Sequence, residues 1–120
     1  MSLPKTYRAA RVLKLGEGPQ MVSVPLQLPG PGQVLVKVLA CGVCFSDLVL
    51  AQGHLGDIFP RTLGHELVGD VVAIGPDVTR FSIGERVGGG WHGGHDNACE
   101  SWTSFLTSLS HTFFRLTPTD

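Results

Sequence analysis

The sequence has 120 residues, of which 42% are hydrophobic, and a formal net charge of -1. These values are typical of one compact domain with an ordinary core. The 9 basic residues nearly balance the 10 acidic ones, and the absence of a basic run argues against a nucleic-acid partner. No apolar run approaches the roughly 20 residues that span a bilayer, and charges interrupt the first 16 residues where a signal peptide would be apolar. We therefore expect a cytoplasmic protein with no membrane partner.

Five segments have the composition of short β-strands. They are rich in β-branched residues and are separated by Gly/Pro turns such as LPGPGQ at 28–33. In the third segment apolar residues alternate imperfectly with Gln33 and Lys37, as in a barrel strand with one covered face. The predicted strands are residues 6–15, 20–26, 33–42, 67–75 and 85–91. The sequence therefore predicts a mainly β fold, a small β-barrel with one or two short helices.

The best helix candidate is CFSDLVLAQG at residues 44–53. Ser46 could cap its first turn and Gly53 could end it. The composition changes after Cys99, where residues 99–120 contain many Ser and Thr and no glycine. This tail could form a short amphipathic helix, a loose strand or a disordered segment, and we expect a helix in its middle. We do not expect it to extend the barrel, but its aromatic side chains could cover the barrel or form a homo-oligomer interface.

Three cysteines cannot form a complete disulfide framework, so metal binding is the chemistry to consider. Cys44, His65 and Glu66 are three of the ligand types that zinc prefers. Asp47 could accept a hydrogen bond from the non-ligating nitrogen of His65, and Ser46 could transfer a proton at the site. The alternative is a buried thiol, a hydrogen-bonded histidine and a surface carboxylate, with Ser46 and Asp47 acting as helix caps.

The runs ACGVCFSD at 40–47 and LGHELVGDVVAIGPDVTRFSIGERVGGGWHGGH at 63–95 resemble the GroES-like catalytic domain of zinc-dependent medium-chain alcohol dehydrogenases. The resemblance covers nearly all of residues 7–95. It implies a GroES-like domain over residues 1–98, followed by a divergent tail at 99–120.

The resemblance also implies a role for each matching residue. Cys44 and His65 match the zinc ligands, and Glu66 matches a glutamate that can exchange onto the metal. Ser46 matches the hydroxyl relay and Asp47 the carboxylate that supports the histidine. Cys41 matches no ligand.

Three departures from the family pattern affect the expected activity. The third zinc ligand of the family comes after residue 120 in chain order, so the catalytic site is incomplete as written. Phe45 stands where a His or Arg often contacts the cofactor's pyrophosphate. In the family's four-cysteine lobe only Cys99 remains, with Asp96 and Trp102 where cysteine would be expected, so a structural zinc is not expected.

The dinucleotide-binding half of the family is not found in the sequence. No predicted strand is followed by a Gly-x-Gly-x-x-Gly turn and a helix. The glycine-rich run VGGGWHGGH at 87–95 is not followed, about 20 residues later, by the acidic residue that would bind the ribose of the cofactor. We therefore expect no NAD(P) binding by the isolated chain and no hydride transfer. These features are typical of a truncated alcohol dehydrogenase domain whose family oxidises alcohols and reduces aldehydes with NAD(P).

Two alternative functions remain open at this point. The barrel cleft could perform cofactor-independent lyase, isomerase or cyclase chemistry on a small organic molecule, using zinc, His65 and Glu66. The chain could also be a non-catalytic interaction module that docks through its tail. The sequence also contains a second candidate zinc site, because the closely spaced residues His92, His95, Asp96 and Cys99 are all acceptable zinc ligands.

Overall fold

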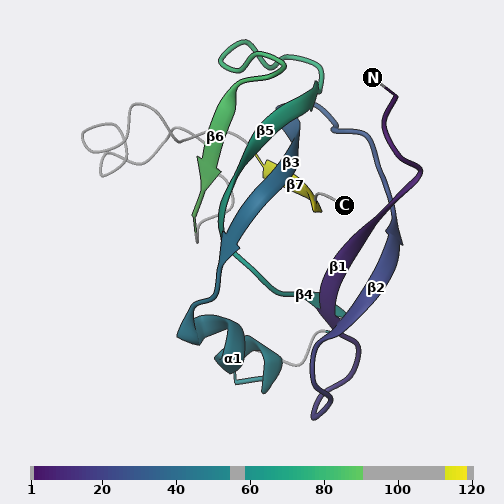
Figure 1. Cartoon of the computed structure of the whole chain (residues 1–120), viewed down its shortest axis with the longest axis vertical. Coiled ribbons are helices and arrows are strands. Elements are labelled where there is room, and N and C mark those ends of the chain that lie inside the picture. The colour runs from purple at the N-terminus through teal and green to yellow at the C-terminus, as the bar shows by residue number, and fades with distance from the viewer. Residues whose placement is uncertain (1, 55–58, 91–112, 119–120) are drawn as a thin grey trace.

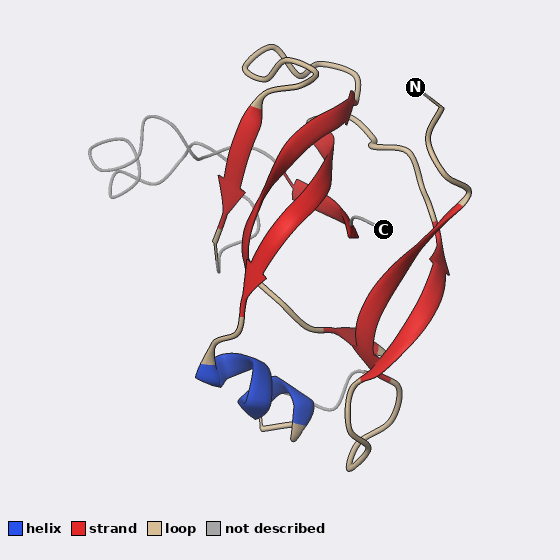
Figure 2. Ribbon diagram, viewed as in Figure 1, coloured by secondary structure: helices blue, strands red, loops and turns tan. Residues whose placement is uncertain are grey.

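The computed structural model describes residues 2–54, 59–90 and 113–118. These residues form two β-sheets and one short helix, which confirms the mainly β prediction (Figures 1 and 2). One sheet has the strand order β2-β1-β4 and the other β6-β5-β3-β7. The elements are β1 (Thr6–Val12), β2 (Gln20–Pro25), β3 (Gln33–Gly42), α1 (Phe45–Ala51), β4 (Arg61–Thr62), β5 (Glu66–Ile74), β6 (Arg86–Gly89) and β7 (Phe113–Pro118).

The smaller sheet is a hairpin with a short third strand. β1 and β2 run antiparallel, with Thr6 opposite Pro25 and Arg11 opposite Gln20. The connection between them contains Gly16 at φ 84°, a left-handed conformation that glycine adopts without steric cost. β4 pairs with the end of β1 through Arg11 and Thr62. This pairing ties the segment that precedes the candidate site to the first strand of the chain.

The larger sheet is built around β3, which pairs antiparallel with β5. The register places Cys41 opposite Leu67 and Gly42 opposite Glu66. Irregularities after Leu35 and after Val38 shift this register, and such bulges bend a strand and increase its twist. The outcome is that the end of β3 and the start of β5 meet at one end of the sheet, where the candidate ligands are (Figure 1).

The core lies on the larger sheet and consists of aliphatic side chains. Val34, Leu35 and Val36 are consecutive and fully buried. Because successive side chains of a strand point to opposite faces, β3 is covered on both faces here. The main buried cluster is Val34, Val36, Leu67, Val71 and Val87, with Val38, Ile74, Val78 and Phe81 packed against it. Burial of each such side chain contributes about 1.5 to 3 kcal/mol.

Helix α1 follows β3 directly and is shorter than predicted. Cys44 is its N-cap residue, so the prediction that Ser46 caps the helix is wrong: Ser46 already lies inside the first turn. The predicted end at Gly53 is close to the observed one, because Gly53 has φ 78° and donates to the carbonyl of Leu50. The next amide, that of His54, donates to the carbonyl of Val49. These two bonds form a Schellman motif, which satisfies carbonyls at the helix end.

The final strand corrects one prediction. Residues 113–118 form β7, which runs parallel to β3 with Gln33 opposite Phe113 and Val38 opposite Pro118. The tail therefore does extend the larger sheet, contrary to expectation, because the backbone of β3 offers an unpaired edge on the side away from β5. The helix predicted for the middle of the tail lies outside the described residues. The proposed boundary between residues 98 and 99 stays a prediction.

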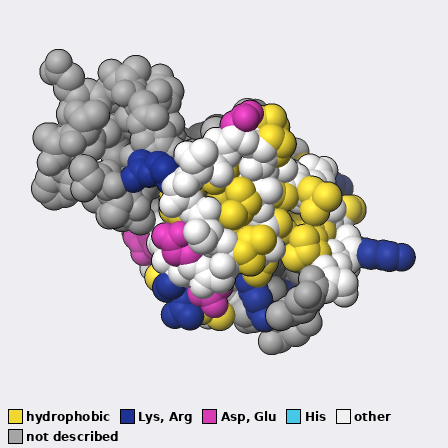
Figure 3. Space-filling view, turned by 90° about the horizontal axis from the view of Figure 1, so that it is seen from above, with side chains coloured by type: hydrophobic (Ala, Val, Ile, Leu, Met, Phe, Trp, Pro, Cys, Tyr) yellow, Lys and Arg dark blue, Asp and Glu magenta, His cyan; other side chains and the backbone are white. Residues whose placement is uncertain are grey.

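The described surface is mixed in character. Hydrophobic side chains gather on the face seen in Figure 3, alongside acidic and basic ones. Large hydrophobic side chains that remain exposed include Leu28, Val43, Phe45 and Ile83. Among the residues that the structure describes, no helix has both the length and the apolar character that crossing a membrane requires.

We predict that Gly69→Ala destabilises the fold. A Cβ at Gly69 would lie 2.3 Å from the carbonyl oxygen of Lys37 and 2.5 Å from Cγ1 of Val36, so β3 and β5 could not keep their separation. Overpacking of this kind costs about 1 to 3 kcal/mol in the free energy of unfolding, measured by denaturant titration. Gly18→Ala is the matched control, because a Cβ there meets nothing within 4 Å. Equal stability of the two variants would contradict the packing described here.

Candidate metal centre

Two junctions of the fold bring the candidate ligands together. Cys44 lies between the end of β3 and the start of α1, and its backbone is extended at φ -107° and ψ 156°. Glu66 is the first residue of β5, and His65 directly precedes it. Gly42 pairs with Glu66 across the sheet. This pairing keeps Cys44, two residues after Gly42, close to His65, which precedes Glu66. The position of the site therefore follows from the register of β3 and β5.

Cys44, His65 and Glu66 form a group that could hold a metal ion. One ligand atom from each lies within 4.8 Å of the other two. Zinc bonds of about 2.0 to 2.3 Å place the ligands of one ion roughly 3.5 Å apart, so a small contraction would close this group around zinc. Cys44 and His65 are half-buried and Glu66 is exposed. The donor set of thiolate, imidazole and carboxylate thus fits zinc, with Glu66 as its most accessible member.

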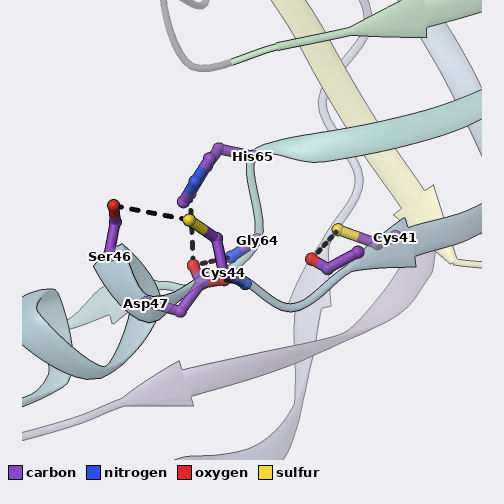
Figure 4. Close-up of polar contacts among 7 residues, drawn as sticks. Cys41, Cys44, Ser46, Asp47, Gly64 and His65 are labelled. Carbon is purple, nitrogen blue, oxygen red and sulfur yellow. Dashed lines mark hydrogen bonds and ion pairs between the residues drawn. The ribbon is translucent and has the colours of Figure 1, made fainter.

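Asp47 connects the two halves of the site. One of its oxygens, Oδ2, accepts a hydrogen bond from the amide of Cys44 at 3.0 Å. The other, Oδ1, accepts one from the amide of Gly64 at 2.9 Å and lies 3.2 Å from Nδ1 of His65 (Figure 4). With Nδ1 directed at this carboxylate, Nε2 is the nitrogen of His65 that can bind a metal. Asp47 therefore both caps α1 and orients His65.

These contacts also set the charge state of Asp47, which is buried in the structure. Burial acts to raise its pKa, but hydrogen bonds from the amides of Cys44 and Gly64 act against burial, and His65 adds to them. Together they hold the pKa of Asp47 below its usual value. The carboxylate is consequently ionised over the neutral range, where it favours a proton on Nδ1 of His65.

The pKa of the Cys44 thiol is also lowered. Its Sγ lies 3.5 Å from Oγ of Ser46 (Figure 4). Hydrogen bonds from the side chain and then the backbone of Ser46, followed by one from His65, lower the pKa of Cys44, while burial and the charge of Glu66 oppose this. The thiolate is the form of cysteine that binds metals, so these contacts prepare Cys44 to be a ligand.

Cys41 lies apart from this group. It is exposed, and its Sγ is directed towards the carbonyl of Gly42 at 3.7 Å rather than towards Cys44 (Figure 4). A Cβ on Gly64 would lie 2.8 Å from this sulfur. Gly64 also has φ 96°, a conformation that favours glycine. The role of Gly64 was not predicted from the sequence.

Two further features considered from the sequence are the alternative ligand set and Phe45. The alternative set of His92, His95, Asp96 and Cys99 lies outside the described residues. Phe45, which follows Cys44, is 76% exposed and adds an apolar surface beside the site in place of a cationic one.

A family model named "Alcohol dehydrogenase GroES-like domain" matches residues 30–113, well over half of the chain. The chain belongs to this alcohol dehydrogenase family. Membership confirms the resemblance seen in the sequence, and the two-sheet structure agrees with it.

Individual relatives and solved structures agree with this family. "Alcohol dehydrogenase notN" of Aspergillus sp. (strain MF297-2) is 46% identical over 101 residues, which are 84% of this chain and 30% of that protein. "Cinnamyl alcohol dehydrogenase 2" of Oryza sativa subsp. japonica is 50% identical over 66 residues, 54% of this chain and 18% of that protein. The structure of acetophenone reductase from Geotrichum candidum in complex with NAD has a TM-score of 0.69 and 30% identity, covering 94% of this chain and 35% of that one. The chain thus spans about a third or less of each of these proteins.

We predict that Asp47→Asn lowers the free energy of unfolding by about 1 to 3 kcal/mol. The amide side chain has one acceptor oxygen, so it cannot satisfy the donors of Cys44, Gly64 and His65 together, and a buried donor left unpaired costs this amount. Denaturant titration measures the change. Asp77→Asn is the matched control, because Asp77 is exposed and at φ 66°, a conformation that Asn tolerates.

A second prediction concerns pH. The pKa of Asp47 is lower in the folded chain than in the unfolded one, so its stabilising contribution is complete above the unfolded value of about 3.9 and is lost as the pH falls through the folded value. The stability difference between the chain and Asp47→Asn should therefore be largest near neutral pH and shrink below about pH 4. Unfolding measured from pH 7 to pH 3 tests this. A difference that grows on acidification would contradict it.

Proposed function

We propose that the chain provides the zinc-binding catalytic domain of an NAD(P)-dependent alcohol dehydrogenase, acting on a small alcohol or aldehyde. The observation that carries this proposal is the convergence of Cys44, His65 and Glu66 within 4.8 Å in a chain of this family. Cys44 and His65 are the proposed protein ligands, and Glu66 occupies a third position. Zinc bound there would supply a Lewis acid that polarises an alcohol or carbonyl oxygen.

The neighbouring side chains have distinct proposed roles. Asp47 fixes the tautomer and the ring orientation of His65, which raises the basicity of the ligating nitrogen. The hydroxyl of Ser46 lies 3.5 Å from the Cys44 sulfur, near enough to the site to pass on the proton of a substrate hydroxyl. Phe45 and Val43 are 76% and 92% exposed and give the side of the site beside Cys44 an apolar surface.

Hydride transfer also requires a nicotinamide oriented against the reacting carbon. We assign dinucleotide binding to the portion of such dehydrogenases that this chain does not span. Acetophenone reductase, of which the chain covers 35%, was solved in complex with NAD. The lyase, isomerase or cyclase alternative, the interaction module and the homo-oligomer stay predictions without a further observation in their favour.

We predict that Cys44→Ser and His65→Ala each lower the zinc content of the purified chain strongly. Each removes a ligand atom, and the remaining donors cannot complete a site of ordinary affinity. Elemental analysis after dialysis against trace zinc measures the effect. Cys41→Ser is the matched control, since it removes a thiol that is exposed and lies outside the ligand group, and its zinc content should not change. Unchanged zinc in both ligand variants would move the site to His92, His95 and Cys99.

A further inference from the structure

The Glu66 carboxylate lies in the space that a side chain at position 42 would occupy. Gly42, the last residue of β3, is paired across the sheet with Glu66, the first residue of β5. A Cβ built on Gly42 would lie 2.8 Å from Oε2 of Glu66 and 3.3 Å from its Cβ. The carboxylate can therefore keep its observed position only because residue 42 has no side chain.

The atom nearest to a Cβ at position 42 determines which group a larger residue there would displace. A Cβ contact below 3.0 Å requires movement, and the nearest atom here is the end of a flexible side chain. The Gly42 backbone does not have a positive φ, so alanine is compatible with its conformation. At Gly69, in contrast, a Cβ would meet the backbone oxygen of Lys37 at 2.3 Å. A methyl group at position 42 would thus move the Glu66 carboxylate, whereas one at position 69 would push on the strand itself.

The displaced group is one of the three candidate ligands. A ligand atom of Glu66 lies within 4.8 Å of those of Cys44 and His65. Glu66 is exposed, and a methyl group at position 42 would come within 2.8 Å of its Oε2. The position of this carboxylate therefore depends on Gly42 more directly than the positions of the other two ligands do.

We propose that Gly42 is a positioning residue for the metal centre: the space beside its Cα holds the Glu66 carboxylate in ligand range. This inference rests on the proposed function of Cys44 and His65 as zinc ligands. It differs from that proposal in assigning a role to a residue that contributes no ligand atom.

The test is a double-mutant cycle on zinc affinity. We would measure the affinity of the 120-residue chain and of Gly42→Ala, Glu66→Ala and the double variant by competition with a chromogenic chelator. Gly42→Ala should bind zinc about tenfold more weakly, the scale typical of residues that support a ligand. In the Glu66→Ala background the same substitution should weaken binding much less, because the carboxylate that it displaces is gone and only the 3.3 Å approach to the Cβ of residue 66 remains. Unchanged affinity of Gly42→Ala, or an equal loss in both backgrounds, would overturn the proposal.

Two further measurements separate positioning from general damage to the fold. The visible spectrum of the cobalt(II)-loaded Gly42→Ala variant should keep its thiolate band, because Cys44 still binds, while the ligand-field bands change with the loss of Glu66. Gly18→Ala, whose added Cβ meets nothing within 4 Å, should change neither the affinity nor the spectrum. If Gly42→Ala fails to fold while the double variant folds, the close approach of Glu66 is supported. If neither folds, the obstruction does not come from the Glu66 carboxylate and the proposal is wrong.

The results also distinguish this inference from the function on which it rests. If Cys44→Ser and His65→Ala leave zinc binding unchanged, the metal centre itself is wrong. If those two variants lose zinc but Gly42→Ala does not, the metal centre stands and the role of Gly42 is rejected.

Discussion

The contacts of the Asp47 carboxylate are the interaction on which the site depends. A buried charge is costly unless hydrogen bonds compensate for it, and here the amides of Cys44 and Gly64 and the ring of His65 do so. Cys44 belongs to the junction of β3 and α1, whereas Gly64 and His65 precede β5. One carboxylate therefore joins the segments that carry two of the candidate ligands, so the stability of this junction and the orientation of His65 cannot change independently.

The register of β3 and β5 is the second constraint. A shift of one residue would turn every side chain of a strand to the opposite face, removing Val34 and Val36 from the core and Gly42 from its place opposite Glu66. The close approach of the two strands at Gly69 helps to fix this register, because a Cβ at this position would collide with the backbone of Lys37 and the side chain of Val36. The same β3–β5 register is consequently required both for packing of the sheet and for alignment of the candidate ligands.

The sequence predicted those features that local signals determine. The strands rich in β-branched residues could be expected from composition. The proximity of Cys44, His65 and Glu66 and the contact of Asp47 with His65 could be expected from the motifs around Cys44 and His65. The pairing of β7 with β3 could not, because no local pattern in the tail specifies a parallel partner far back in the chain. The N-cap of α1 was predicted two residues too late, at Ser46 instead of Cys44, because serine is a common N-cap residue and cysteine is not. The contact between Gly42 and Glu66 is invisible in the sequence because it exists only once the strands are paired.

The candidate ligands consequently differ in how firmly they are held. Cys44 and His65 are half-buried and both are tied to Asp47, one through its backbone amide and the other through its ring. Glu66 is exposed, and space beside a glycine, rather than a hydrogen bond to Asp47, accommodates its carboxylate. A metal centre with two fixed ligands and one adjustable ligand can open a coordination position without disturbing the fold. Catalytic zinc sites need such a position for water or substrate, whereas structural sites are closed. The unequal support of the three side chains is therefore what the proposed catalytic centre would require.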